Sequence, residues 1–133
     1  MTFEQKTVGD VLVLTPRKNL VGGDETNELL TAIERVAAAG PARVVMDLGE
    51  INFVSSLGVG LLRKASISCR ESGGWLRLAR IAKIIENTLL VTGLIIYFET
   101  FETVDEAVQA PGQETPGRLP RTRPEPRPKR PEA

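Results

Sequence analysis

Two adjacent serines, Ser55 and Ser56, are the residues of this chain whose type and position best suit chemistry. They lie in INFVSSLGVG, residues 51–60, between an apolar run typical of a buried strand and a segment with helical spacing. A hydroxyl at this junction can cap the helix by accepting a backbone N–H hydrogen bond. It can also accept a phosphoryl group, because the free N–H groups and the dipole of a helix start favour phosphate. The pattern leaves both roles open.

Two glycines follow the serines, at positions 58 and 60. Glycine costs about 0.5–1 kcal/mol relative to alanine inside a helix, so its repeated use near a helix start indicates a geometric need. The missing side chains would let a partner backbone or a nucleotide phosphate approach closely. A phosphate added beside them would bring about −1.5 to −2 charges, which a helix start tolerates and a close apolar interface does not.

The composition excludes several classes of catalytic and metal site. The chain has no histidine and one cysteine, Cys69, which rules out an internal disulfide, a Ser-His or Cys-His nucleophile and a histidine-containing zinc site. No Gly-x-Ser-x-Gly elbow and no convergent set of acids and bases appears. We therefore expect no cofactor, no metal and no enzymatic activity. Cys69 is expected in the core.

The charge distribution divides the chain into a domain, residues 1–110, and a tail, residues 111–133. The tail holds seven of the nine prolines and six Lys or Arg against three Glu, a net charge of +3. Because the whole chain is neutral, residues 1–110 carry −3, which argues against direct nucleic-acid binding. Such a tail buries too little apolar surface to fold and is expected to be disordered. It is an inert solubilising segment, a tether to an anionic surface or a proline-motif ligand.

Targeting signals are missing from the sequence given. The first ten residues, MTFEQKTVGD, lack the basic and apolar regions of a signal peptide. The longest nearly apolar run, LLVTGLIIYF, is about half the length that a bilayer span needs. We expect a cytoplasmic protein that is not inserted in a membrane. The oligomeric state stays open.

The first half of the chain predicts a hairpin, a helix and a strand. Two short segments with strand-like residues flank Gly9 and Asp10, which is typical of a β-hairpin. An amphipathic helix follows, with Asp24 as its expected N-cap and a stop at Gly40 and Pro41. Its inward stripe comprises Leu29, Leu30, Ile33, Val36 and Ala37. Residues 42–48 form an apolar run typical of a strand buried on both faces, with Asp47 expected as a solvated carboxylate at its end.

The second half continues the alternation of helices and strands. The second helix should bury a stripe of Leu57, Leu61, Leu62, Ala65 and Cys69. A strand over 75–79 precedes a third helix, whose inward residues should be Ile84, Ile85, Thr88 and Leu89. We expect a last short strand over 94–98 and a closing helix with a capping box at Thr103 and Glu106. This order predicts an α/β fold with a mostly parallel or mixed sheet of about five strands and about four helices. Ser55 and Ser56 then lie at the functional edge of this sheet, where strands end and helices begin.

Two stretches of the chain resemble a known family. VVMDLGEINFVSSLGVGLL is similar to the central stretch of the STAS domain of bacterial anti-sigma-factor antagonists, an apolar strand ending in Asp-Leu, an aromatic residue, then Asp-Ser-Ser/Thr-Gly-Leu-Gly opening a helix. LLVTGLIIYFETFETVDEAV resembles the closing stretch of that domain. The likeness spans about residues 5–110 in element order.

The resemblance implies regulation by partner switching. A protein of this kind captures an ATP-binding anti-sigma kinase of the GHKL type and so frees a sigma factor. The kinase phosphorylates a hydroxyl of the motif, the complex separates, and a serine phosphatase resets the system. The alternative within the same family is a scaffold or accessory subunit of a signalling complex or membrane transporter, in which phosphorylation is optional.

Residue by residue, the motif of this chain departs from the family pattern. Aligned without gaps, Ser55 stands where the family has Asp, Ser56 at its first hydroxyl and Leu57 at its second. The resemblance therefore implies Ser56 as the phosphorylation site, with Ser55 as the alternative. The partner-binding residues that it implies are Ser55, Ser56, Leu57, Gly58, Val59 and Gly60.

Overall fold

Strands and helices alternate along the chain in the predicted order. The computed structural model describes residues 3–111, and the predicted tail beyond Pro111 lies outside this part. The elements are β1 (Phe3–Val8), β2 (Val11–Pro16), α1 (Asp24–Ala39), β3 (Arg43–Asp47), α2 (Ser56–Glu71), β4 (Trp75–Ala79), α3 (Lys83–Val91), the 3-10 helix η1 (Leu94–Tyr97), β5 (Glu99–Phe101) and α4 (Val104–Gln109).

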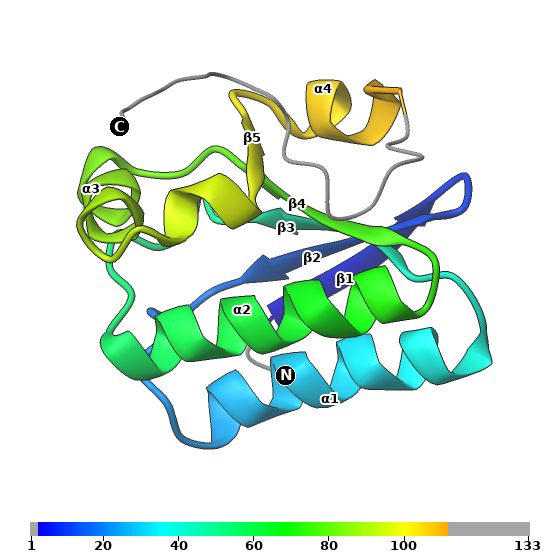
Figure 1. Ribbon diagram of the computed structural model, residues 1–133, viewed down its shortest axis with the longest axis horizontal. Helices are drawn as coiled ribbons and strands as arrows, with labels where there is room; N and C mark the ends of the chain where they lie inside the picture. The colour runs from blue at the N-terminus through cyan, green and yellow to red at the C-terminus, as the bar shows by residue number, and fades with distance from the viewer. Residues whose placement is uncertain (1–2, 112–133) are drawn as a thin grey trace.

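The strands form one five-stranded mixed sheet in the order β1-β2-β3-β4-β5 (Figure 1). β1 and β2 are antiparallel, and Gly9 in the turn between them has a φ of 62°, a left-handed conformation that glycine adopts readily. β2 to β5 run parallel to one another. The predicted α/β fold, the N-terminal hairpin and the mixed sheet are thus confirmed.

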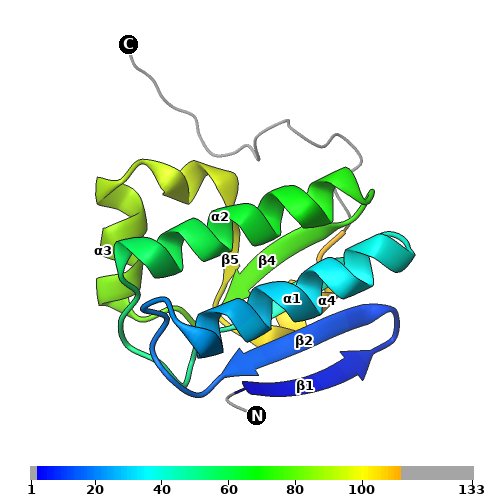
Figure 2. The same ribbon diagram turned by 90° about the horizontal axis from the view of Figure 1, so that it is seen from below.

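The helices cover the two faces of the sheet unequally. α1 and α2 lie side by side across one face, α3 lies at the end of the sheet, and the short α4 sits on the opposite face (Figures 1 and 2). The main core lies under α1 and α2 and includes the predicted stripe residues Leu29, Ile33, Leu61, Leu62, Ala65 and Cys69. This apolar burial is the main force that fixes the sheet against its helices.

A second, smaller core lies between the sheet and α4. It consists of Val11, Val13, Val45, Ala79 and Ala107. Successive residues of a strand point to opposite faces, so Val44 and Met46 of β3 join the main core while Val45 joins this one. All three are fully buried, which confirms that β3 is covered on both sides.

Several predicted element boundaries are confirmed. α1 ends at Ala39, directly before Gly40, and β4 spans Trp75–Ala79 as predicted. α4 begins after Thr103, whose hydroxyl accepts the backbone N–H of Glu106 at 3.1 Å. At these positions, the residue types next to each boundary were sufficient to predict where the element begins or ends.

The predicted start of α1 is wrong in one respect, because Asp24 is the first helical residue and not its cap. Gly23 precedes the helix and provides no side-chain cap. The hydroxyl of Thr26 instead accepts the backbone N–H of Gly22 at 3.0 Å, and this bond shapes the turn into the helix. The polar side chain that organises the turn therefore lies inside the first helical turn.

Two predictions in the 81–98 region are also wrong. Residues 94–97 form a 3-10 helix, and the last strand begins only at Glu99. Gly93, with a φ of 77°, turns the chain immediately before this segment, so the apolar run does not extend. Ile84 was expected in the core, yet it is half exposed, whereas Ile85 and Leu89 are fully buried. A nine-residue helix that covers only the end of the sheet buries a narrow stripe.

Candidate functional site

The start of α2 lies at the edge of the sheet where the parallel strands end. The segment after β2 meets the segment after β3 there, because Leu20 and Val54 form an isolated parallel bridge. The backbone N–H of Ser55 donates to the carbonyl of Leu20 at 2.9 Å. Two loops far apart in the sequence are therefore tied together immediately before the serines.

Ser55 is the N-cap of α2. Its backbone is extended, with φ −86° and ψ 179°, and its Oγ accepts the backbone N–H of Gly58 at 3.3 Å. The same hydroxyl lies 3.5 Å from the carbonyl of Leu20, to which it donates. The hydroxyl of Ser55 is thus occupied in holding the helix start, as the capping interpretation predicts for one of the two serines.

Ser56 differs from its neighbour in exposure and in contacts. It is the first residue of α2, it is exposed, and its hydroxyl has no hydrogen-bond partner within the described residues 3–111. The first turn of α2 contains no acidic residue. The positive end of the helix dipole is therefore not compensated by a carboxylate on that turn, and a negative group on Ser56 would be favoured electrostatically.

Leu57 lies outside the core, which overturns the prediction that it heads the buried stripe of α2. Its side chain is 66% exposed. It lies over Gly22, where a Cβ atom would fall 2.7 Å from the Leu57 Cδ1 atom. Val21 and Phe53, from the two loops that meet here, are also exposed. We call Val21, Phe53 and Leu57 the apolar rim, since they come from the segments that flank the serines.

The two glycines of the motif have different surroundings. Gly58 is buried, and a Cβ atom there would fall 2.2 Å from the carbonyl oxygen of Leu20. Its missing side chain admits this chain's own backbone and not that of a partner, which corrects the sequence interpretation. Nothing lies within 4 Å of the Cβ position at Gly60. Val59 is buried as well, so Gly58 and Val59 support the site from beneath.

Asp47, predicted to be solvated, is buried and paired. Its carboxylate accepts two hydrogen bonds from the Arg80 guanidinium, at 2.8 and 3.2 Å, and one from the backbone N–H of Gly49 at 3.0 Å. The hydrogen bond and charge of Asp47 raise the pKa of Arg80 above its usual value. Arg80 has a φ of 58°, which L-residues rarely adopt. The pair ties the end of β3, where the loop into α2 begins, to the residue that follows β4.

Sequence reasoning missed two arginines, Arg77 and Arg80, and the pattern of β4 could have singled out Arg77. Residues 75, 77 and 79 must share one face of the strand, so a charged residue at 77 lies on a face that is otherwise apolar. Arg77 is fully buried, and its guanidinium lies 3.8 Å from the centre of the Trp75 ring. Trp75 packs against the smaller core between the sheet and α4.

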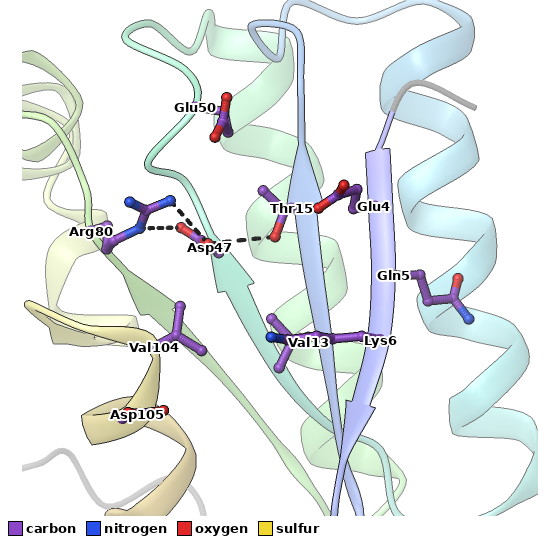
Figure 3. A pocket seen from close by; sticks show the side chains of 10 residues that line it. All are labelled: Glu4, Gln5, Lys6, Val13, Thr15, Asp47, Glu50, Arg80, Val104 and Asp105. Atoms are coloured by element: carbon purple, nitrogen blue, oxygen red, sulfur yellow. Dashed lines mark hydrogen bonds and ion pairs between the residues drawn. The ribbon is translucent and has the colours of Figure 1, made fainter.

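No set of metal ligands accompanies the serines. Within residues 3–111, no cluster of three or more Cys, Asp or Glu side chains is arranged to hold a metal ion. A pocket on the α4 face of the sheet is lined by Asp47 and Arg80 but by neither serine (Figure 3). Among the helices of residues 3–111, none has the length and apolar character required to cross a bilayer.

These features define a small α/β module with a mixed five-stranded sheet and an exposed helix start after its middle strand. The family model of the STAS domain matches residues 2–107, so the chain belongs to the STAS domain family. None of the curated proteins compared with the chain matches it.

Solved structures share the fold at low sequence identity. An anti-sigma factor antagonist from Mycobacterium paratuberculosis is 24% identical, with a TM-score of 0.69 over 82% of this chain and 92% of the other. The Bacillus cell fate determinant SpoIIAA in its phosphorylated form is 18% identical, with a TM-score of 0.65 over 80% and 96%. The murine anion transporter Slc26a9 is 16% identical, with a TM-score of 0.64 over 77% of this chain and 18% of the transporter.

Proposed function

We propose that this protein is a regulatory binding module of the anti-sigma-factor-antagonist type that works by partner switching. It captures an anti-sigma kinase of the GHKL class in the cytoplasm through the start of α2 and the apolar rim. It acts by binding and not by catalysis. Membership of the STAS family and the fold shared with anti-sigma factor antagonists support this proposal.

The observation that carries the proposal is the contrast between the two serines. Ser55 is engaged as the helix cap, while Ser56 is exposed and its hydroxyl has no partner in the described part of the chain. We assign Ser56 as the phosphate acceptor and a serine phosphatase as the enzyme that resets it. Ser55 is the alternative acceptor, at the cost of the capping bond.

Phosphate at Ser56 would act on binding and leave the fold intact. The group would sit at the positive end of α2, where about two negative charges are tolerated. When the kinase covers the apolar rim, the phosphate beside the rim would lie in a desolvated interface. Burial of an unpaired charge is strongly unfavourable. Phosphorylation therefore separates the complex while the domain stays folded.

The first experiment is a pull-down from the native host combined with phosphosite mass spectrometry. We expect an ATP-binding kinase to co-purify and phosphate to appear on Ser56. With the captured kinase, Ser56→Asp should weaken binding by about tenfold or more, which corresponds to about 1.4 kcal/mol, with an unchanged melting temperature. Thr31→Asp, at an exposed hydroxyl of α1, is the matched control and should leave the affinity unchanged.

A second candidate function is a scaffold or accessory subunit of a signalling complex or membrane transporter. The exposed Leu57, which stands where the family pattern has a second hydroxyl, favours it, since an apolar anchor suits constitutive binding. The part of the anion transporter Slc26a9 that matches this chain, 18% of the transporter, has a similar fold. Equal affinities of wild type, Ser56→Asp and Ser56→Ala for the captured partner would select this function and reject the switch.

A further inference from the structure

The α4 face of the sheet is only partly covered. α4 has six residues and packs against β3, β4 and β5. Beside it, toward β1 and β2, lies an open pocket of about 520 Å³ (Figure 3). Val13 and Val104 provide its apolar surface, and polar side chains form most of the remainder: Glu4, Gln5, Lys6, Thr15, Asp47, Glu50, Arg80 and Asp105.

The charges that line this pocket are predominantly negative. Four carboxylates face two cations, Lys6 and Arg80, which gives a net charge of −2. Arg80 is paired with Asp47, and Glu4 is paired with Arg17 outside the pocket. Glu50 and Asp105 form no salt bridge within residues 3–111. The pocket therefore suits a cationic occupant.

Arg77 fixes the position of Pro111, the last described residue, on the same face of the sheet. Its buried guanidinium donates to the carbonyl of Ala107 at 2.9 Å, of Ala110 at 3.0 Å and of Pro111 at 2.7 Å. A further bond joins its Nε to Glu99 at 2.9 Å. The carbonyl of Ala107 belongs to the last turn of α4, and those of Ala110 and Pro111 follow the helix, so these bonds anchor Pro111 to β4.

The segment beyond Pro111 has the charge and the length to reach the pocket. Residues 112–133 carry six Lys or Arg and three Glu, against −3 for residues 1–110. Its 22 residues can span about 70 Å when extended, whereas the radius of gyration of a domain this size is about 13 Å. Since the segment is tethered, its effective concentration is in the millimolar range, at which individually weak ion pairs suffice.

We propose that the basic segment 112–133 binds in the acidic pocket on the α4 face of its own chain. The guanidinium groups of its arginines would pair with the carboxylates of Glu50 and Asp105, a geometry that arginine forms in bidentate fashion. Glu50 belongs to the loop between β3 and α2, so the bound segment borders the loop that ends at Ser55, directly before Ser56. This proposal does not depend on the proposed function.

The test is paramagnetic broadening in the full-length protein with a nitroxide label at Thr122→Cys, in the middle of the basic residues. The native thiol of Cys69 is fully buried and will not take the label. We expect the amides of Lys6, Glu50 and Asp105 to lose about half of their intensity or more. Salt at about 0.5 M should restore these signals, because it screens ion pairs at an exposed site.

A pair of charge-reversal variants provides the control. The double variant Glu50→Lys with Asp105→Lys should abolish the broadening. The double variant Glu34→Lys with Glu71→Lys, at exposed positions of α1 and α2, should leave it unchanged. Intact amide spectra establish that each variant is folded. Absent broadening, or broadening centred on α1 and α2, would overturn the proposal.

A mixed sample separates docking within one chain from docking between chains. It combines labelled protein without ¹⁵N and ¹⁵N wild type without the label. Unchanged ¹⁵N signals in this sample, together with broadening in the singly prepared protein, support docking within the chain. Broadening of the pocket amides in the mixture would show that a second copy supplies the segment, and would overturn the proposal as stated.

Discussion

On one face of the sheet, α1 and α2 bury aliphatic side chains over most of their length, whereas on the other face a small apolar core under α4 is combined with hydrogen bonds from the guanidinium of Arg77. The first arrangement depends on the exclusion of water and is non-directional. The second depends on directed hydrogen bonds that lose their value when one partner is removed. The side covered by α1 and α2, which we call the helix-covered side, thus provides a rigid base for the start of α2, while the α4 side leaves polar groups accessible.

The largest expected effect tests how well the helix-covered side excludes water. Burial raises the pKa of the Cys69 thiol from 9.0 to about 12. At pH 8 the folded protein should therefore react with a thiol reagent about a thousandfold more slowly than the urea-unfolded protein, since the thiolate is the reactive form. Labelling followed by mass spectrometry measures both rates.

The same shift makes stability depend on pH in a defined direction. The folded state holds the thiol proton more tightly than the unfolded state, so the contribution of Cys69 is complete below pH 9 and declines as the pH rises toward 12. Cys69→Ala should remove this part of the alkaline decline, which comparison of the two proteins isolates. Equal labelling rates of the folded and unfolded protein would contradict a dry interior here.

The second prediction concerns the α4 side and removes Arg77, its buried cation. Arg77→Met retains much of the packing volume but leaves three backbone carbonyls and Glu99 without their donor, and we expect a loss of about 3 kcal/mol in the free energy of unfolding. Urea denaturation measures this loss. Arg63→Met, at an exposed position of α2, is the control and should change the stability by less than about 0.5 kcal/mol. Similar losses for both would mean that α4 does not depend on Arg77.

Within α2, the two glycines predict effects of opposite sign. Gly58→Ala places a methyl group against the carbonyl of Leu20 and should cost about 2 kcal/mol, because backbone must move to admit it. Gly60→Ala meets open space inside the helix and should stabilise the protein by about 0.5–1 kcal/mol. Thermal denaturation of both variants gives the comparison. Destabilisation by Gly60→Ala would show that this position is constrained by something other than helix geometry.

The smallest expected effect separates the two serines. Ser55→Ala removes the N-cap of α2 and should cost about 1 kcal/mol. Ser56→Ala removes an exposed hydroxyl without a partner in the described residues and should change the stability by less than about 0.5 kcal/mol. Denaturant titration resolves the difference. If the two variants were equally stable, the assignment of separate roles to the serines would lose its structural basis.

Much of the fold was predictable because its signals are local. The turn at Gly9, the stop at Gly40 and the cap at Thr103 depend on neighbouring residues only, and each is confirmed. Residues 94–97 could not be assigned in this way, since a short apolar run fits a strand and a helix equally well. The position of Gly93 decided between them.

The candidate site was less predictable because its contacts join distant residues. Asp47 is paired with Arg80, 33 positions later in the chain, and Gly58 lies under the carbonyl of Leu20, 38 positions earlier. Periodicity placed Leu57 on the buried stripe, but its side chain lies over Gly22 and is exposed, whereas Gly58 and Val59 in the same turn are buried. Helical periodicity alone does not reveal which residues of a first turn the neighbouring loops cover.

The backbone of Arg80 has a consequence for how this protein can vary. Its left-handed conformation costs an L-residue about 1 kcal/mol, and glycine would adopt it without that strain. Arg80→Gly would leave the carboxylate of Asp47 without its arginine partner. The replacement should therefore lower the stability of this sequence, and raise the stability of a variant in which residue 47 carries no charge. Positions 47 and 80 form an epistatic pair, and we expect substitutions at the two positions to occur together in related sequences.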